Sequence, residues 1–231
     1  MPRSDELRAE VLAANLALPE HGLVKLTWGN VSGIDREQGI VAIKASGVAY
    51  EAMTVDDIVL VSLAEGEVVD GVRRPSTDTP THLALYRAVA EVGGVVHTHS
   101  PWACAWAQAE REIPVLGTTH ADLSDEPIPL TRALTPDEVY EDYEGATGAV
   151  LIEAVSGRAA QRPGALVRGH GPFCWGQDPA TAVQNAVTLE EVARIAFLTT
   201  ALAPDVRPLS EVLREKHFSR KHGPGGYYGQ P

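Results

Sequence analysis

Two histidines separated by a single residue are the first candidates for chemistry in this chain. His97 and His99 belong to residues 94–100, where glycine and β-branched residues predict a short buried strand. Side chains alternate along a strand, so both imidazoles are expected on one face. Two neutral imidazoles on a rigid strand can bind one divalent cation. A His-x-His pair is also compatible with two ordinary core or surface histidines, so further ligands are needed to decide.

His170 and Asp78 are the further candidate ligands. His170 lies between two glycines after the apolar residues 165–167, and these glycines allow a sharp turn that exposes the imidazole. On its own it fits a turn histidine equally well. Three imidazoles with one open position are the pattern of a catalytic zinc site. Asp78 offers a carboxylate as a fourth ligand, although it can instead cap the helix that follows it.

Three short polar stretches have the residue types that bind phosphate. Residues 27–30, 44–47 and 76–77 offer hydroxyls, amides and glycine-freed backbone N–H groups, and Lys44 adds a positive charge. Ordinary turns contain the same residue types, so each stretch alone is weak evidence. The sequence has neither a Walker loop nor a dinucleotide fingerprint, and it therefore does not indicate nucleotide chemistry.

The composition is that of an ordinary globular protein. Of the 231 residues, 44% are hydrophobic and 22% charged, which predicts one domain over residues 1–231. A formal net charge of -12 disfavours binding to nucleic acid or to anionic membranes. The two cysteines lack redox or metal spacing, and no segment resembles a signal peptide or a membrane span. These features favour a cytoplasmic protein.

Apolar periodicity predicts the elements that must position these residues. Adjacent strands with flanking helices predict an α/β domain with a largely antiparallel central sheet. A capping box at residues 135–138 and an N-cap at Asp178 mark two helix starts. Helices are expected at 7–18, 80–93, 101–108, 136 onward, 180–202 and 209–218; strands at 23–32, 41–44, 58–61, 94–99, 149–152 and 165–170; and a loop at 117–122.

Several motifs spread over the whole chain are together similar to those of the class II aldolase/epimerase superfamily, and within it to the L-ribulose-5-phosphate 4-epimerase family. The matching segments are residues 26–32, 76–82, 96–100, 117–122, 170–173, 175–176, 220–223 and 227–230. The combination is highly specific, and it outweighs the interpretation of the histidines as ordinary core residues.

The resemblance implies a fold, an assembly and a metal. The fold is a three-layer α/β/α domain, and the assembly is a fourfold-symmetric homotetramer in which residues 219–231 reach a neighbouring subunit. His97, His99 and His170 would bind one zinc ion per subunit, with Asp78 at the metal. Mn²⁺ or Co²⁺ can substitute at such sites.

The resemblance also assigns roles to other residues. The acid/base pair would be Asp122 and, from a neighbouring subunit, Tyr228. The contacts to the substrate phosphate would fall on Asn30, Ser46, Gly47, Ser76 and Thr77, with Lys44 and His217 nearby. Residue 45 is alanine where proline is common, and residues 158–161 look shorter than in relatives. Neither departure touches a motif residue.

The implied activity is the interconversion of L-ribulose 5-phosphate and D-xylulose 5-phosphate, as in arabinose catabolism. C4 carries no acidic hydrogen, so its configuration cannot be inverted by simple deprotonation. Breaking the C3–C4 bond in a retro-aldol step, and re-adding the aldehyde on its other face, can invert it. A metal would take up the negative charge that develops. Two acid/base groups on opposite sides of C4 would exchange the hydroxyl proton.

Three alternatives remain to be weighed against the epimerase. A class II sugar-phosphate aldolase of the fuculose- or rhamnulose-phosphate type shares the metal but releases the aldehyde, and it carries glutamate at the position of Asp78. A non-catalytic interaction module, as in adducin heads, lacks the metal histidines. A methylthioribulose-phosphate dehydratase is a more remote possibility. The three histidines together with Asp78 favour the epimerase.

Overall fold

The fold is built around one antiparallel sheet. The computed structural model describes residues 3–159 and 161–227. Within these residues seven strands have the order β4-β3-β2-β1-β5-β7-β6, and every neighbouring pair is antiparallel. The prediction of a largely antiparallel sheet is confirmed. The strands are β1 (Asn30–Asp35), β2 (Ile40–Lys44), β3 (Ile58–Ser62), β4 (Val68–Asp70), β5 (Gly94–His97), β6 (Gly164–Leu166) and β7 (Pro172–Gly176).

Both faces of this sheet are buried, because the strands are apolar on both sides. In β3, Val59 and Val61 belong to one hydrophobic core, whereas Ile58 and Leu60 belong to the other. This alternation follows from the two-residue period of a strand. The sheet is therefore the middle of three layers, as the resemblance implies.

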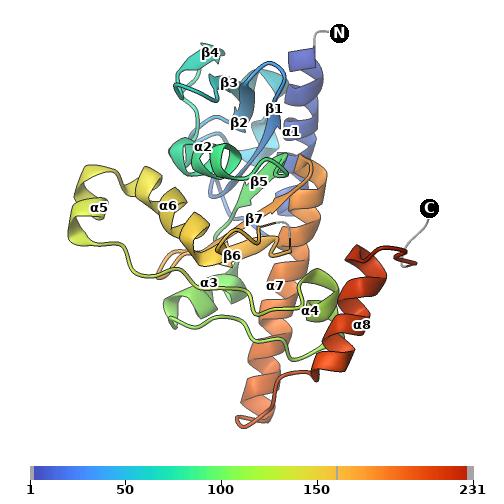
Figure 1. Ribbon diagram of the computed structural model, residues 1–231. Helices are drawn as coiled ribbons and strands as arrows, with labels where there is room; N and C mark the ends of the chain where they lie inside the picture. Colours follow the sequence, from blue (N-terminus) through green and yellow to red (C-terminus); the bar gives the residue numbers. More distant parts are fainter. Residues whose placement is uncertain (1–2, 160, 228–231) are drawn as a thin grey trace.

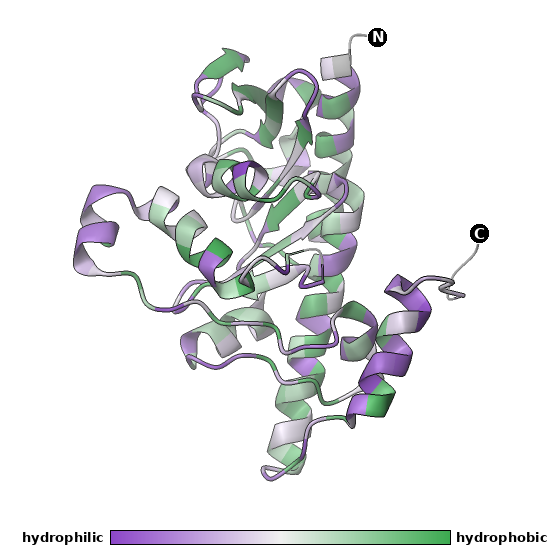
Figure 2. Ribbon diagram, viewed as in Figure 1, coloured by the Kyte–Doolittle hydropathy of each residue, from purple (hydrophilic) through white to green (hydrophobic). Residues whose placement is uncertain are grey.

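Helices cover the two faces (Figure 1). On one face α1 and α7 lie side by side against the sheet, and on the other α2 packs against α6. Figure 2 shows apolar strands between these layers, while α8 is mostly hydrophilic. In the described part of the chain, no helix combines the length and the apolar character needed to cross a membrane. The α-helices are α1 (Arg3–Glu20), α2 (Thr79–Ala88), α3 (Pro101–Gln108), α4 (Thr118–Leu123), α5 (Pro136–Glu141), α6 (Tyr143–Val155), α7 (Pro179–Leu202) and α8 (Glu211–His222), and two short 3-10 helices cover Tyr50–Ala52 and Val55–Asp57.

The helix starts at residues 136 and 179 have the predicted caps. The Thr135 side chain accepts a hydrogen bond from the backbone of Glu138, and the Glu138 side chain completes the capping box. Asp178 accepts a hydrogen bond from the backbone of Thr181 at the start of α7. Local sequence signals thus predict these two boundaries correctly.

Three predicted elements are wrong. Residues 149–152 form part of helix α6 and not a strand, because a short apolar run fits a buried helix as well as a buried strand. The strand expected from residue 23 begins only at Asn30, after a turn in which Leu26 has a positive φ of 53°. Residues 118–123 form the short helix α4 and not a loop. The strand Pro172–Gly176 was not expected at all.

Glu190 of α7 fixes the start of α3, directly after the His97–His99 segment. Its two carboxylate oxygens accept hydrogen bonds from the backbone N–H groups of Trp102 at 2.8 Å and Ala103 at 2.9 Å. These N–H groups lie in the first turn of α3, where the helix itself supplies no acceptor. A carboxylate from a neighbouring helix therefore satisfies both donors and ties α3 to α7.

We predict that Glu190→Gln lowers the free energy of unfolding by about 1–3 kcal/mol, because the amide replaces one of two charge-assisted acceptors with a donor. Urea unfolding at fixed protein concentration measures this. Glu191→Gln is the matched control, because the Glu191 side chain is nearly half exposed on the same helix and forms a surface ion pair with Arg194. Equal effects of the two substitutions would contradict the capping role.

Candidate active site

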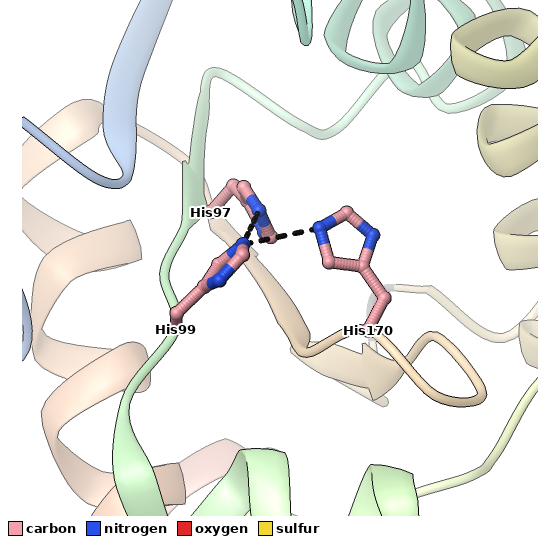
Figure 3. Close-up of side chains that lie close together, drawn as sticks. All are labelled: His97, His99 and His170. Carbon is pink, nitrogen blue, oxygen red and sulfur yellow. Dashed lines mark hydrogen bonds between the residues drawn. The ribbon is translucent and has the colours of Figure 1, made fainter.

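Three imidazoles converge at one end of the sheet (Figure 3). The Nε2 atom of His99 lies 3.1 Å from Nε2 of His97 and 3.1 Å from Nε2 of His170. One nitrogen of each ring lies within 4.8 Å of the other two. The structure thus brings together the three histidines that the sequence singled out, although His170 is 71 residues from His99.

Strand pairing places these rings. His97 ends β5 and pairs with Phe173 near the start of β7, so the two strands place His97 beside the turn that carries His170. The His97 ring stacks on the Phe173 ring, with centroids 4.1 Å apart and planes 15° apart. The Nδ1 atom of His97 lies 3.0 Å from the carbonyl oxygen of Pro172. A carbonyl can only accept, so Nδ1 carries the hydrogen and Nε2 presents its lone pair to the other two rings.

Two glycines allow the chain to approach His97 closely. A Cβ at Gly29 would lie 2.8 Å from the His97 carbonyl oxygen, and the φ of Gly29 is +80°. A Cβ at Gly171 would lie 2.8 Å from the carbonyl oxygen of Thr98. Both contacts are shorter than a side chain permits, so glycine is required where these two loops meet β5.

The geometry and charge of the three rings suit a divalent metal ion. Nitrogens that each lie about 2.0–2.1 Å from one tetrahedral zinc ion are roughly 3.3–3.4 Å apart, close to the spacing of the Nε2 atoms. Burial lowers the pKa of His97 to about 3 and also lowers the pKa of His170. Both rings are therefore neutral at pH 7, which is the form that binds metals. Three imidazole nitrogens that face one point can all offer lone pairs to a single cation.

Asp78 lies beside the imidazoles and does not cap α2. The residue precedes α2, but its side chain forms no capping hydrogen bond within the described chain. Instead the Asn30 amide donates to Asp78 Oδ2 at 2.6 Å. Burial works to raise the pKa of Asp78, yet His97, His82 and the bond from Asn30 outweigh it and hold the pKa below its ordinary value. The carboxylate is therefore ionised next to the three rings.

A pocket of about 480 Å³ joins the imidazoles to the polar stretches of the sequence. Lys44 is the cationic side chain in its lining, and it is almost fully buried. Burial lowers the pKa of Lys44, while Asp57 and Asp78 oppose this. Its Nζ makes two long hydrogen bonds of 3.4 Å to backbone carbonyls, which leaves donor capacity for a ligand. Ten predicted site residues line this one pocket: Asn30, Lys44, Ser46, Gly47, Ser76, Thr77, Asp78, His97, His99 and His170.

Asp122 and His217 lie elsewhere in the same chain. The carboxylate of Asp122, on α4, binds the guanidinium of Arg220 at 3.0 and 2.7 Å, and His217 Nδ1 lies 3.1 Å from its Oδ1. Both partners belong to α8. Asp122 lines a different pocket, together with Gly176 at the far end of β7 from Pro172. Within one described chain, neither Asp122 nor His217 is part of the lining of the pocket that holds the imidazoles, so their expected roles remain predictions.

Two further residues in the pocket were missed by the sequence reasoning. Tyr143 and Glu144, at the start of α6, contribute to its lining, and the Tyr143 hydroxyl lies 3.2 Å from His170 Nδ1. No periodic or motif signal marks these positions, because their place depends on how α6 packs against α2. The predicted residue Tyr228 falls outside the described residues.

Comparison with known proteins identifies relatives along the whole length. The family model described as "Class II Aldolase and Adducin N-terminal domain" matches residues 9–197. Curated relatives named L-ribulose-5-phosphate 4-epimerase UlaF, from Salmonella paratyphi A and Salmonella typhi, are 55% identical over 226 residues, which is 97% of this chain and 99% of theirs.

Solved structures share the fold at lower identity. An L-fuculose 1-phosphate aldolase has a TM-score of 0.80 at 23% identity, with 92% of this chain and 94% of that chain covered. The aldolase/epimerase/decarboxylase-like protein YgbL from Escherichia coli has a TM-score of 0.74 at 22% identity, over 92% of this chain and 97% of its own. At such identities these matches show the fold alone.

We predict that the protein binds one divalent ion per chain and that His97→Asn loses most of this binding while the fold survives, because removing a ligand leaves the packed strand in place. Metal content after dialysis measures binding, and circular dichroism checks the fold. His21→Asn is the control, since this exposed histidine lies after α1, away from the pocket. Full metal content in His97→Asn would overturn the site.

Proposed function

The chain belongs to the class II aldolase and adducin N-terminal domain family, and we propose that within this family it is an L-ribulose-5-phosphate 4-epimerase. It interconverts L-ribulose 5-phosphate and D-xylulose 5-phosphate by breaking and re-forming the C3–C4 bond. The observation that carries this proposal is the 55% identity to curated epimerases over nearly the full length of both chains. Fold similarity alone does not distinguish an epimerase from an aldolase, because an aldolase that is only 23% identical to this chain has the same fold.

The three imidazoles are proposed to hold the metal that the reaction needs. A divalent ion bound there acts as a Lewis acid and stabilises the negative charge that develops on substrate oxygens during bond cleavage. Zinc suits three histidine nitrogens with an open position, while Mn²⁺ or Co²⁺ can occupy the same ligands. The His97–Pro172 hydrogen bond supports this assignment, because it fixes the ring nitrogen that faces the site.

The other end of the pocket is proposed to bind the substrate phosphate. Lys44 supplies the positive charge, and backbone and hydroxyl groups of the neighbouring loops supply donors. Its two long hydrogen bonds leave the ammonium able to reorient toward an anion. A phosphate held there prevents the aldehyde fragment from leaving between cleavage and re-addition. The contacts proposed with Lys44 are Ser46, Gly47, Ser76 and Thr77. Asn30 is proposed to lie beside the phosphate without donating to it, because both hydrogens of its amide are donated to Ser76 and Asp78.

Asp122 is proposed as an acid/base group that acts on the substrate of a neighbouring subunit. Burial works to raise its pKa, but hydrogen bonds and positive charge from Arg220 and His217 hold the pKa below its ordinary value. The carboxylate is thus ionised and able to accept a proton. Because it lines a pocket away from the imidazoles, it needs a second copy of the chain to reach them. Tyr228, six residues after the end of α8 at His222, is proposed as the second such group.

The separation of Asp122 from the imidazoles supports sites between subunits, and we propose that the assembly is the homotetramer that the resemblance implies, with one domain per chain. The segment expected to reach a neighbour begins inside α8, since residues 219–222 are helical. In this arrangement His217 hydrogen bonds to Asp122 and is not proposed to contact the phosphate directly. A cytoplasmic setting agrees with two buried free cysteines.

We predict that the protein loaded with Zn²⁺ or Mn²⁺ converts L-ribulose 5-phosphate into D-xylulose 5-phosphate far faster than it releases fragments. Asp78 is one methylene shorter than the glutamate of the aldolases, so it is poorly placed to protonate the carbon of the enediolate. A coupled assay for D-xylulose 5-phosphate measures the rate, with metal-free protein as the control. Stoichiometric accumulation of dihydroxyacetone and glycolaldehyde phosphate would instead identify an aldolase.

We also predict that two inactive variants restore each other's activity when their subunits are mixed. Asp122→Asn alone is expected to lose roughly two or more orders of magnitude in rate, and His97→Asn loses the metal. Random assembly of equal amounts places an intact metal site beside an intact Asp122 in about a quarter of the sites. Native mass spectrometry confirms mixing, and the coupled assay measures the rate.

The control mixture pairs Asp122→Asn with Tyr228→Phe. Asp122 is bound to α8 of its own chain, and Tyr228 follows α8 closely in sequence, so one chain is expected to supply both groups. This control mixture should then stay inactive. If the first mixture forms mixed oligomers and also stays inactive, Asp122 does not act across a subunit boundary.

A further inference from the structure

Tyr143 is the one hydroxyl-bearing side chain in the described residues that hydrogen bonds to a ring of the imidazole cluster. Its Oη lies 3.2 Å from Nδ1 of His170, and its ring is tilted by 33° against the imidazole. Figure 3 shows the other side of the same ring, where a nitrogen of His170 points toward His99. Tyr143 therefore contacts the nitrogen of His170 that faces away from the cluster.

The direction of this hydrogen bond follows from the chemistry of imidazole. When His170 offers the Nε2 lone pair to a metal, the hydrogen of the neutral ring must be on Nδ1. The Tyr143 oxygen then accepts, and the phenol hydrogen is free to point into the pocket. If His170 adopted the other tautomer, Tyr143 would donate to Nδ1 and Nε2 could not bind a metal. The hydroxyl can support either tautomer, unlike the Pro172 carbonyl that holds His97.

The backbone around Tyr143 is firmly held. Asp142 caps α6 by accepting a hydrogen bond from Gly145 N at 3.1 Å. The Thr147 hydroxyl donates to the Tyr143 carbonyl at 2.8 Å, and the Thr81 hydroxyl of α2 donates to the Glu144 carbonyl at 2.6 Å. Helices α2 and α6 lie side by side in Figure 1. The start of α6 is therefore anchored to the helix that follows Asp78.

The close approach of the two helices depends on a small residue. A Cβ at Gly148 would lie 2.5 Å from the Cβ of Ala84, so α6 and α2 are nearly in backbone contact. Because the helices pack so closely, Tyr143 at the start of α6 lies in the lining of the pocket, whose other residues come mostly from strand ends and loops. Tyr143 is itself half-exposed, which means that removing its hydroxyl leaves the core intact.

We propose that Tyr143 is a positioning residue: its hydroxyl accepts the Nδ1–H of His170 when Nε2 faces the metal, and this hydrogen bond orients the ring and raises the metal affinity of the site. The phenol oxygen lies within hydrogen-bond distance of the ring nitrogen that faces away from the cluster. It then acts as a neutral acceptor for the Nδ1–H of His170 and as a donor toward the pocket. This proposal rests on the proposed metal site, and its test does not require the substrate.

The test compares zinc affinity among single variants, measured by competition with a chromophoric chelator. Tyr143→Phe keeps the ring but removes the acceptor, and its zinc dissociation constant is expected to rise about tenfold to a hundredfold. Tyr140→Phe is the matched control, because Tyr140 is 87% exposed on the neighbouring helix α5, and it should bind zinc like the unmodified protein. Circular dichroism and urea unfolding verify that each variant is folded.

Tyr143→Ala separates the hydroxyl from the packing of the ring. If the hydroxyl carries the effect, Tyr143→Phe should account for most of the affinity that Tyr143→Ala loses. Affinity in Tyr143→Phe equal to the unmodified protein would overturn the proposal, whatever Tyr143→Ala does. The test is also independent of the proposed activity. If Tyr143→Phe weakens zinc binding and Tyr140→Phe does not, but the protein shows no epimerase activity, then the proposed activity is wrong and the role of Tyr143 stands.

Discussion

The hydrogen bond between His97 and the carbonyl of Pro172 is the interaction on which the site depends. It joins the last residue of β5 to the first residue of β7 at 3.0 Å, and it fixes which ring nitrogen of His97 is protonated. A buried bond of this kind contributes only about 1 kcal/mol net to stability. Its larger effect is chemical, because it turns the Nε2 lone pair toward two other imidazoles. The antiparallel pairing of β5 with β7 makes this geometry possible, since it brings a strand end and a strand start together.

The same antiparallel arrangement explains why the pocket collects residues from distant parts of the chain. Asn30 starts β1 and pairs with His97, and Lys44 ends the next strand, β2. Strand starts and strand ends alternate along one end of such a sheet, so the start of β1, the end of β2, the end of β5 and the turn before β7 meet there, and residues 76–78 and 143–144 complete the lining. The protein as a whole is strongly acidic, yet this end holds a buried lysine and three imidazoles. The proposed phosphorylated substrate would therefore be attracted locally, by Lys44 and by a metal held on the imidazoles, against the charge of the surface.

The sequence predicted what depends on local pattern and missed what depends on packing. The alternation in residues 94–99 was enough to place His97 and His99 on one side, and two capping signals placed helix starts correctly. The run at 149–152 was assigned wrongly, because both helices and strands can bury such a segment. Tyr143 was missed for a related reason: its position follows from the contact of α6 with α2, which no spacing in the sequence encodes. The place of Asp122 likewise depends on α8, about a hundred residues later.

Asp78 shows how one hydrogen-bond network can link the two halves of the substrate site. Its carboxylate accepts from Asn30, and the same Asn30 amide donates to the hydroxyl of Ser76 in the proposed phosphate region. Both donor hydrogens of that amide are thus committed within the protein, while its oxygen is buried without a partner among the described residues. An acceptor left unpaired in a pocket is costly unless a ligand donates to it. A sugar hydroxyl can donate and a phosphate dianion cannot, so Asn30 is suited to contact the carbon chain between metal and phosphate. The same hydrogen bond from Asn30 orients the Asp78 carboxylate beside the imidazoles, so one amide links the metal-facing and phosphate-facing parts of the pocket.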